Sequence, residues 1–250
     1  MAKTVQCDRS LYKEYDKARK KCKILLICTG VSFVLFAVMG YINVETYGKF
    51  FFVMPILVVC FLASGIMAGR FSQQAQIIAV GLEGERKTAE LLGVLPDSYY
   101  CFQNLKIRHG DGVSEIDAAV VGPTGVFVIE TKNLNGNIVG NYANRDWVQH
   151  KVGRRGTPYS KVFHSPVKQV GTQVHRLAGF LKDNRTGVYV ESAVFFTNPA
   201  AMLQLSGVPS KTPVFSQSAG DALKLITFIA DRETKLTDAQ VRNIAKLLGA

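Results

Sequence analysis

The sequence predicts an α/β fold, with a mixed central sheet flanked by helices and preceded by a two-helix transmembrane hairpin. Three observations predict this class. Residues 24–43 and 50–69 are apolar runs without a charged residue. Residues 113–132 alternate apolar with polar or small side chains around the turn signal Gly-Pro-Thr-Gly at 122–125, which is typical of a β-hairpin. The remaining pattern is helix, strands, helix, strand, then a shorter strand and helices.

The two apolar runs predict a pair of membrane-spanning helices. Each has 20 residues, about the length that crosses a bilayer. A signal peptide would instead be one shorter run followed by a small-residue cleavage site. The alternative is that both helices are buried in a soluble core. On the first interpretation the chain has three parts, which are a basic segment 1–23, a transmembrane hairpin 24–69 and a domain 70–250.

The distribution of basic residues predicts the orientation. Residues 1–23 hold eight Lys and Arg against three acidic residues, whereas the loop between the apolar runs has only Glu45 and Lys49. The positive-inside rule therefore places the N-terminus and residues 70–250 in the cytoplasm, as in a multi-pass protein of the cell inner (plasma) membrane. The basic run 17–23 is expected beside anionic lipid headgroups of the bilayer.

Net charge and cysteine content indicate what kind of partner the chain binds and in which cellular compartment it lies. Residues 70–250 carry 21 Lys and Arg against 15 Asp and Glu, an excess that suits a polyanionic partner. The five cysteines are scattered, show no metal-binding spacing and are odd in number, so free thiols in a reducing compartment are expected.

Local patterns predict the elements of residues 70–250. Residues 71–92 have helical spacing, with Glu85 interrupting an otherwise apolar face, so Glu85 belongs either to a site or to a surface position. Residues 152–164 are basic and are read as a loop. The expected strands are 99–107, the two halves of 113–132, 137–142, 147–152, 188–196 and 213–216, and the expected later helices are 166–181, 219–230 and 238–248.

The register of the 113–132 hairpin brings carboxylates together. If Val121 faces Val126 across a four-residue loop, Asp117 lies opposite Glu130. Glu115 then lies opposite Lys132, and the simplest interpretation of that pair is a structural ion pair. Like charges directly opposed on a sheet are destabilising, so the two facing acids call for a shared proton, a lysine or, best, a divalent metal.

The residues Asp117, Glu130 and Lys132 have the spacing of the PD-(D/E)xK nuclease motif, which predicts a restriction-endonuclease-like core. Glu85 on the preceding helix and Gln169 on the following one are expected to add polar groups to this face. The alternatives are a salt-bridged surface cluster of the three motif residues and a glutamine that only caps a strand.

Five stretches of the wider sequence form a recognisable series in this order. They are Gly81-Leu82-Glu83-Gly84-Glu85, Ser114-Glu115-Ile116-Asp117, Gly125-Val126-Phe127-Val128-Ile129-Glu130-Thr131-Lys132-Asn133 with Gly136, Trp147, and Ser165-Pro166-Val167-Lys168-Gln169. On these stretches the chain resembles the nuclease-related domain (NERD) family from about Ala79 to the C-terminus. Ser165 departs from the family, in which Asn precedes the proline; both residues cap helices.

The resemblance implies metal-assisted phosphodiester hydrolysis. Asp117, Glu130 and the Thr131 carbonyl would hold Mg²⁺ (or Mn²⁺), a hard cation that prefers oxygen ligands. Lys132 would orient the attacking water or stabilise charge on the phosphate. Glu85 would add a ligand or position a water, and Gln169 would orient the substrate or a ligand.

Several basic residues are candidates for binding nucleic acid, because phosphate contacts supply sequence-independent affinity. A merely solvated loop is the alternative for them. Trp147 is read as a core anchor rather than a base-stacking platform, and the four histidines as surface residues. The candidate nucleic-acid-binding residues are Lys151, Arg154, Arg155, Lys161 and Lys168.

Two functions from different classes follow. The first is a membrane-anchored nuclease, with DNA as the expected substrate. The second is a membrane-tethered nucleic-acid-binding or scaffold protein with a vestigial nuclease site. Besides nucleic acid and the lipid bilayer, the candidate partners are a second copy of the chain or separate proteins. Because the sequence has no P-loop lysine, any ATP-driven partner is expected to be a separate chain.

Overall fold

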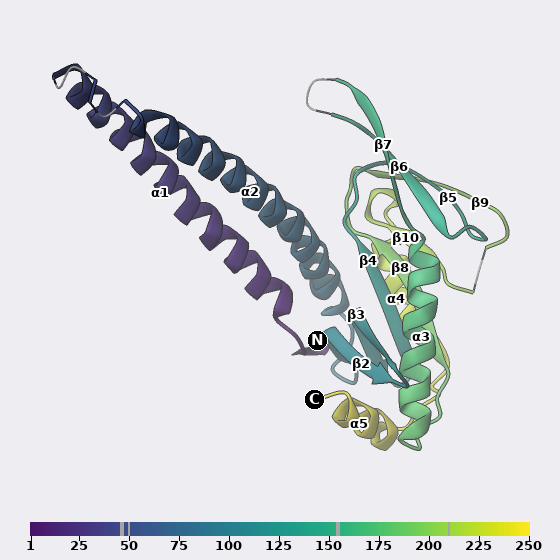
Figure 1. The fold of residues 1–250 in the computed structure, drawn as a ribbon. Helices are drawn as coiled ribbons and strands as arrows, with labels where there is room; N and C mark the ends of the chain where they lie inside the picture. Colours follow the sequence, from purple (N-terminus) through teal and green to yellow (C-terminus); the bar gives the residue numbers. More distant parts are fainter. Residues whose placement is uncertain (46–47, 50, 154–155, 210) are drawn as a thin grey trace. The chain divides into compact units, whose positions relative to one another are not determined.

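The computed structural model describes residues 1–45, 48–49, 51–153, 156–209 and 211–250. The chain forms two compact units (Figure 1). One comprises Ser10–Leu82 and the other comprises Met1–Arg9 together with Glu83–Ala250.

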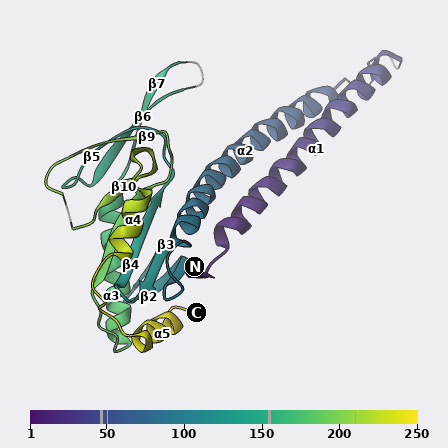
Figure 2. The same ribbon diagram turned by 180° about the vertical axis from the view of Figure 1, so that it is seen from behind.

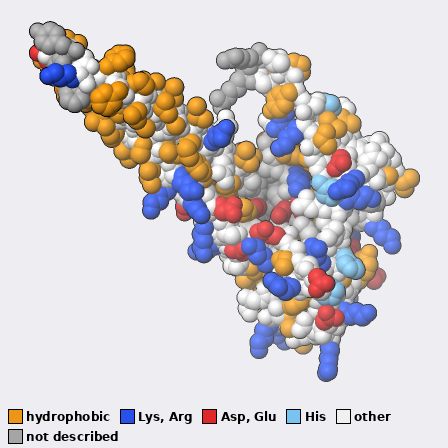
Figure 3. Space-filling model, viewed as in Figure 1, with side chains coloured by type: hydrophobic (Ala, Val, Ile, Leu, Met, Phe, Trp, Pro, Cys, Tyr) orange, Lys and Arg blue, Asp and Glu red, His pale blue; other side chains and the backbone are white. Residues whose placement is uncertain are grey.

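The first unit is a helical hairpin. Helix α1 spans Ser10–Glu45 and helix α2 spans Val53–Leu92, and both are long and apolar enough to cross a membrane. Their apolar side chains are exposed and cover the hairpin in Figure 3, so the structure does not bury these helices in a soluble core. Between the helices, the Thr29 hydroxyl donates to Ser64 Oγ at 2.9 Å. Phe50, the first residue of the second predicted span, lies outside the described residues.

Helix α2 is longer than predicted. The sequence pattern predicts separate helices at 50–69 and 71–92, whereas the structure has one continuous helix that passes from the first unit into the second. The change from apolar to mixed composition at Arg70 therefore does not mark a helix boundary.

The second unit is built on a six-stranded mixed sheet in the order β1-β2-β3-β4-β8-β10. β2–β3 and β3–β4 are antiparallel, whereas β1–β2, β4–β8 and β8–β10 are parallel, so the predicted mixed sheet is confirmed. Its strands are β1 (Lys3–Gln6), β2 (Tyr100–His109), β3 (Gly112–Gly122), β4 (Gly125–Lys132), β8 (Val190–Phe196) and β10 (Val214–Ser216).

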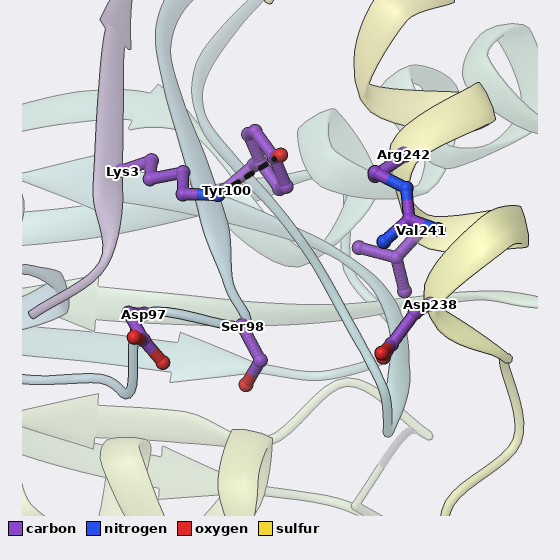
Figure 4. A pocket seen from close by; sticks show the side chains of 7 residues that line it. All are labelled: Lys3, Asp97, Ser98, Tyr100, Asp238, Val241 and Arg242. Atoms are coloured by element: carbon purple, nitrogen blue, oxygen red, sulfur yellow. Dashed lines mark hydrogen bonds between the residues drawn. The ribbon is translucent and has the colours of Figure 1, made fainter.

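The basic segment 1–23 contains strand β1, which was not predicted. It forms the edge of the sheet, parallel to Tyr100–Gln103 of β2. Beside it, a pocket of about 260 Å³ carries side chains of both charges, and Lys3 donates to the Tyr100 hydroxyl at 3.2 Å (Figure 4). The residues that line this pocket are Lys3, Asp97, Ser98, Tyr100, Asp238, Val241 and Arg242.

Helices cover both faces of the six-stranded sheet, and the views from front and back show α3 and α4 on opposite sides of it (Figures 1 and 2). Helices α3 (Pro166–Asp183) and α5 (Asp238–Leu247) contribute to one apolar core. Leu92, at the end of α2, and helix α4 (Ala222–Ala230) contribute to the other. The alternating apolar residues of β3 and β4 supply both cores, which is why these two strands are buried almost throughout.

A second, four-stranded sheet has the order β7-β6-β5-β9. Strands β5 (Gly136–Asn141) and β6 (Asp146–Val152) are as predicted. Strand β7 (Pro158–His164) pairs with β6, so the interpretation of 152–164 as a loop is wrong there, and β9 (Ala201–Ser206) was not predicted.

Trp147 joins the second sheet to the first core. Its ring is buried and stacks on Phe196 with centroids 6.4 Å apart and an interplanar angle of 4°. Its indole N–H donates to the Asn141 carbonyl at 3.1 Å. The interpretation of Trp147 as a core anchor is confirmed, because a buried, hydrogen-bonded indole presents no face to a nucleic-acid base.

Two helix starts follow the sequence signals. Thr237 is the N-cap of α5, as predicted, and it forms a reciprocal capping box with Gln240. Ser165 and Pro166 begin α3, but the Ser165 hydroxyl makes no capping hydrogen bond. A 3₁₀ turn at Gln217–Ala219 precedes α4, which starts later than predicted.

Candidate active site

The candidate site lies where strands β3 and β4 stop pairing. The register is the predicted one, with Val121 opposite Val126, but Gly122 pairs with Gly125, so the turn has two residues instead of four. The paired register ends at Ala118 and Ile129, although both strands continue. We call the diverging ends, residues 115–117 of β3 and 130–132 of β4, the β3–β4 fork.

Helix α3 holds the β3 arm of the fork. The Gln173 amide donates to the Glu115 carbonyl at 3.0 Å. The Arg176 guanidinium donates to the Val113 carbonyl at 2.9 Å and to Ser114 Oγ at 2.7 Å. This arm of β3 is thus fastened to a helix beyond the point where its pairing with β4 ends.

Asp117 bridges the fork with its carboxylate. Its Oδ2 accepts a hydrogen bond from the Thr131 backbone N–H at 2.8 Å. Burial, and then the charge of Glu130, raise the pKa of Asp117 to about 8 despite this hydrogen bond and the nearby Lys132 charge. The two acids therefore act on each other as the register predicted, but Asp117 reaches β4 through its side chain and not as a ladder partner.

Glu130 is fully buried and is held from two sides. Lys132 Nζ donates to its Oε1 at 2.6 Å, and Gln173 Nε2 donates to its Oε2 at 2.7 Å. A buried carboxylate persists only when it is paired and hydrogen-bonded, and here a cation and an amide meet that requirement.

Lys132 connects the fork to α3. Besides Glu130, its ammonium donates to Gln169 Oε1 at 3.0 Å, so Gln169 is part of the site and is not a strand cap. The predicted ion pair between Glu115 and Lys132 is wrong. The strands have separated at that level, so Glu115 is exposed on the other arm while Lys132 bonds to Glu130.

Glu85 approaches the fork from the end of α2. Its Oε2 accepts a hydrogen bond from Asn104 Nδ2 at 3.0 Å. Burial raises the pKa of Glu85, and the charge of Glu115 adds to that shift against the Asn104 hydrogen bond. Gly84 allows the close approach, because a Cβ there would lie 2.7 Å from Asn133 Cβ. The predicted inward position of Glu85 is thus observed.

Two residues of the site were missed by the sequence analysis. Gln173 follows Gln169 by one helical turn, and this spacing was the only available signal. Asn104 is buried in β2 with φ at +52°, a left-handed conformation that asparagine tolerates better than most residues. That conformation is not visible in the sequence.

The donor set of the fork suits a hard divalent cation. Two carboxylates converge there, and their mutual repulsion is what a cation relieves. The Thr131 N–H points to Asp117, and the carbonyl of a strand residue points to the same side as its N–H, so a backbone oxygen faces the same space. Among the described residues no group of three His, Cys, Asp or Glu side chains is placed to hold a metal.

The predicted basic residues lie on different elements. Lys151 on β6 and Lys161 on β7 are close enough that the Lys161 charge, after burial, lowers the pKa of Lys151. Lys168 is exposed on α3. Arg154 and Arg155 lie outside the described residues.

The four histidines lie at the surface, as predicted. His150, His164 and His175 are exposed and His109 is partly exposed.

The fold defines the class of this domain as an α/β, restriction-endonuclease-like core, and the fork carries the residues that have the PD-(D/E)xK spacing. Residues 80–197 match the family model of the nuclease-related domain. Every residue of the fork, together with Glu85, Gln169 and Gln173, lies inside the matched range.

Two curated proteins are similar to the chain. An uncharacterized protein of Bacillus anthracis is 36% identical over 93 residues, which is 36% of this chain and 43% of that protein. The probable kinase PglW of Streptomyces coelicolor is 27% identical over 175 residues, which is 65% of this chain but 11% of that protein. The chain therefore spans less than half the length of either relative. No solved structure matches the chain.

Proposed function

We propose that the chain is a membrane-anchored, metal-dependent nuclease that hydrolyses phosphodiester bonds of DNA. The observation that carries this proposal is the β3–β4 fork inside a nuclease-related domain, where Asp117, Glu130 and Lys132 converge. A chance surface cluster does not account for it, since Glu130 is fully buried and both of its oxygens are hydrogen-bonded.

The Asp117 and Glu130 carboxylates and the Thr131 carbonyl would hold Mg²⁺ (or Mn²⁺). When bound, the cation supplies Lewis-acid polarisation of the phosphate and makes water a better nucleophile. Asp117 is oriented for this task by the Thr131 N–H, and Glu130 by Gln173, so both ligands are positioned before any cation arrives.

Lys132 supplies a positive charge beside the reacting phosphate. Gln169 accepts one of its N–H groups and so fixes the direction of the ammonium. From that position Lys132 orients the attacking water or stabilises the negative charge that builds on the phosphate oxygens. Glu85, held by Asn104, adds a third carboxylate at the mouth of the fork that positions a water or contributes a ligand.

Lys151 and Lys161 are proposed to contact the phosphate backbone, since two neighbouring cations are relieved by a shared polyanion. Replacing both by Ala should weaken DNA binding at every sequence and reduce the slope of log K against log salt by about 2. Fluorescence anisotropy at several salt concentrations measures this. Lys224→Ala, which removes an exposed charge on α4, is the matched control, and an equal loss in that variant contradicts the assignment.

We further propose that α1 and α2 cross the inner membrane with the N-terminus and the nuclease-related domain in the cytoplasm. The support is the eight Lys and Arg among residues 1–23 beside two exposed apolar helices. Two reporters fused at the C-terminus test this. One that works only in the cytoplasm should be active, and one that works only outside it should be inactive. Activity of a reporter that works only outside the cytoplasm would reverse the orientation.

The direct test of the nuclease is to incubate the full chain, purified in detergent, with plasmid and linear DNA. The full chain is required because a fragment beginning at Phe71 would lack strand β1. Cleavage is expected with Mg²⁺ or Mn²⁺ and not with a chelator. Salt-sensitive DNA binding without cleavage under any metal would instead support the scaffold with a vestigial site.

A further inference from the structure

We propose that Gln173 is the positioning residue that sets the geometry of the β3–β4 fork for its cation. This inference rests on the proposed metal-dependent function and assigns a role to a residue that does not itself touch the reacting atoms. Gln173 Nε2 donates to Glu130 Oε2 at 2.7 Å and to the Glu115 carbonyl at 3.0 Å.

These two acceptors lie on opposite arms of the fork. Glu115 belongs to β3 and Glu130 to β4, and the paired register of the two strands has already ended at Ala118 and Ile129. The Gln173 side chain therefore links the two arms where the sheet no longer does. Since Asp117 and Glu130 are the proposed ligands on these arms, this amide fixes the Glu130 carboxylate relative to the β3 backbone two residues before Asp117.

The orientation of the amide is dictated by its partners. Both hydrogens of Nε2 are used by acceptors, so the nitrogen has to face the fork and the oxygen has to face away from these two groups. Gln173 is only 3% exposed, and its Oε1 has no hydrogen-bond partner among the described residues. A buried carbonyl without a partner is unfavourable, so leucine or methionine would suit this position better if packing alone decided it. The two hydrogen bonds that Nε2 donates explain why a glutamine occupies this buried position.

Glu130 also shows why a neutral donor is needed. Its other oxygen already has the Lys132 ammonium at 2.6 Å. A second fixed cation would compete with Mg²⁺ for the carboxylate, whereas an amide orients it without cancelling its charge. Hydrogen-bond partners of ligating carboxylates have this function in metal sites generally.

Arg176 provides a matched comparison on the same helix. It also fastens the β3 arm to α3, through the Val113 carbonyl and Ser114 Oγ, but no described contact joins it to Glu130. A substitution there disturbs the docking of β3 on α3 and leaves the ligand carboxylate untouched. Comparing variants of Gln173 and Arg176 therefore distinguishes the positioning of Glu130 from the general packing of β3 on α3.

The test measures Mn²⁺ binding by electron paramagnetic resonance on the full chain in detergent, without DNA. Gln173→Met should weaken Mn²⁺ binding about 10- to 100-fold and alter the spectrum of the bound ion, while Arg176→Met should bind as the wild type does. Gln173→Asn keeps an amide but is one methylene too short to reach both arms, so it should also weaken binding. It serves as the second variant if Gln173→Met folds poorly, as judged by thermal unfolding.

The outcomes separate this inference from the proposed function. Unchanged Mn²⁺ binding in both Gln173 variants, or an equal loss in Arg176→Met, overturns the positioning role while the metal site stands. If the wild type and Asp117→Asn bind Mn²⁺ alike, the fork is not the metal site and both proposals fail.

Discussion

Replacing Asp117 with Asn is expected to abolish metal-dependent cleavage of DNA. The change keeps the shape of the side chain and removes one of the two carboxylate charges that would hold the cation. Metal stabilisation of a transition state is worth several kcal/mol, and each ~1.4 kcal/mol is tenfold, so the loss should be on the order of a thousandfold. Single-turnover cleavage of plasmid with Mg²⁺ measures it.

The same variant should fold normally, which distinguishes a lost ligand from a lost structure. An Asn oxygen still accepts the Thr131 N–H, and the repulsion with Glu130 disappears. Because the folded-state pKa of Asp117 is raised to about 8, its neutral form stabilises the metal-free protein at low pH. That contribution is lost as pH rises from about 4, the unfolded value, through about 8.

The melting temperature of the metal-free wild type should therefore fall, relative to Asp117→Asn, as pH rises over this range. Thermal unfolding of both proteins from pH 5 to pH 9 checks the sign. Added Mg²⁺ should raise the melting temperature of the wild type most at the alkaline end and leave the variant unchanged. A variant that melts lower than the wild type at every pH would show a structural role for Asp117 instead.

Lys132→Met is expected to give the second large effect, a loss of cleavage of about 10²- to 10³-fold, as when one preorganised electrostatic donor is removed from an active site. Its Mn²⁺ binding should persist, since the ammonium is not a ligand and its hydrogen bond to Glu130 competes with the cation. Cleavage kinetics and Mn²⁺ binding of the same preparation give the comparison.

Lys87→Met is the control for that substitution. Lys87 is a more exposed lysine on α2 that forms an ion pair with Glu83 at 3.7 Å, so its removal should leave both measurements unchanged. Loss of Mn²⁺ binding in Lys132→Met, or cleavage at the wild-type rate, would contradict the role assigned to Lys132.

The β3–β4 hairpin could be predicted because its information is local. Apolar alternation on both sides of a Gly-Pro-Thr-Gly turn specifies which residues face each other, and Val121 does lie opposite Val126. The start of α3 at Pro166 and the cap of α5 at Thr237 are equally local signals. The predicted pairing of β3 with β4 extends to Ala118 and Ile129, and this places the next residues, Asp117 and Glu130, close together. Lys132 follows two positions later on β4.

The fork itself could not be predicted, because its cause is tertiary. Beyond Ala118 the β3 arm pairs with β2 but no longer with β4, and it is hydrogen-bonded by Gln173 and Arg176, which lie far along the chain. The extrapolated pairing of Glu115 with Lys132 failed for that reason. Asn104, whose backbone conformation breaks the regular path of β2, carries no unusual pattern in the sequence.

Strands β7 and β1 were not predicted, because their own sequences carry little information about strand formation. Nearly all of β7 is exposed, so its residues show no apolar alternation, and its basic composition resembles a loop. Strand β1 has four residues inside a basic segment and pairs with Tyr100–Gln103, almost a hundred positions away. Such strands are specified by their partners more than by their own composition.

The central claim is that the β3–β4 fork cleaves DNA with a metal held by Asp117. The most direct measurement is plasmid cleavage by the full chain with Mg²⁺, run beside Asp117→Asn purified in the same way. Cleavage by the wild type that stops on addition of chelator and is absent from Asp117→Asn is the predicted result. Equal cleavage by the two proteins, or none by the wild type with either Mg²⁺ or Mn²⁺, would contradict the claim.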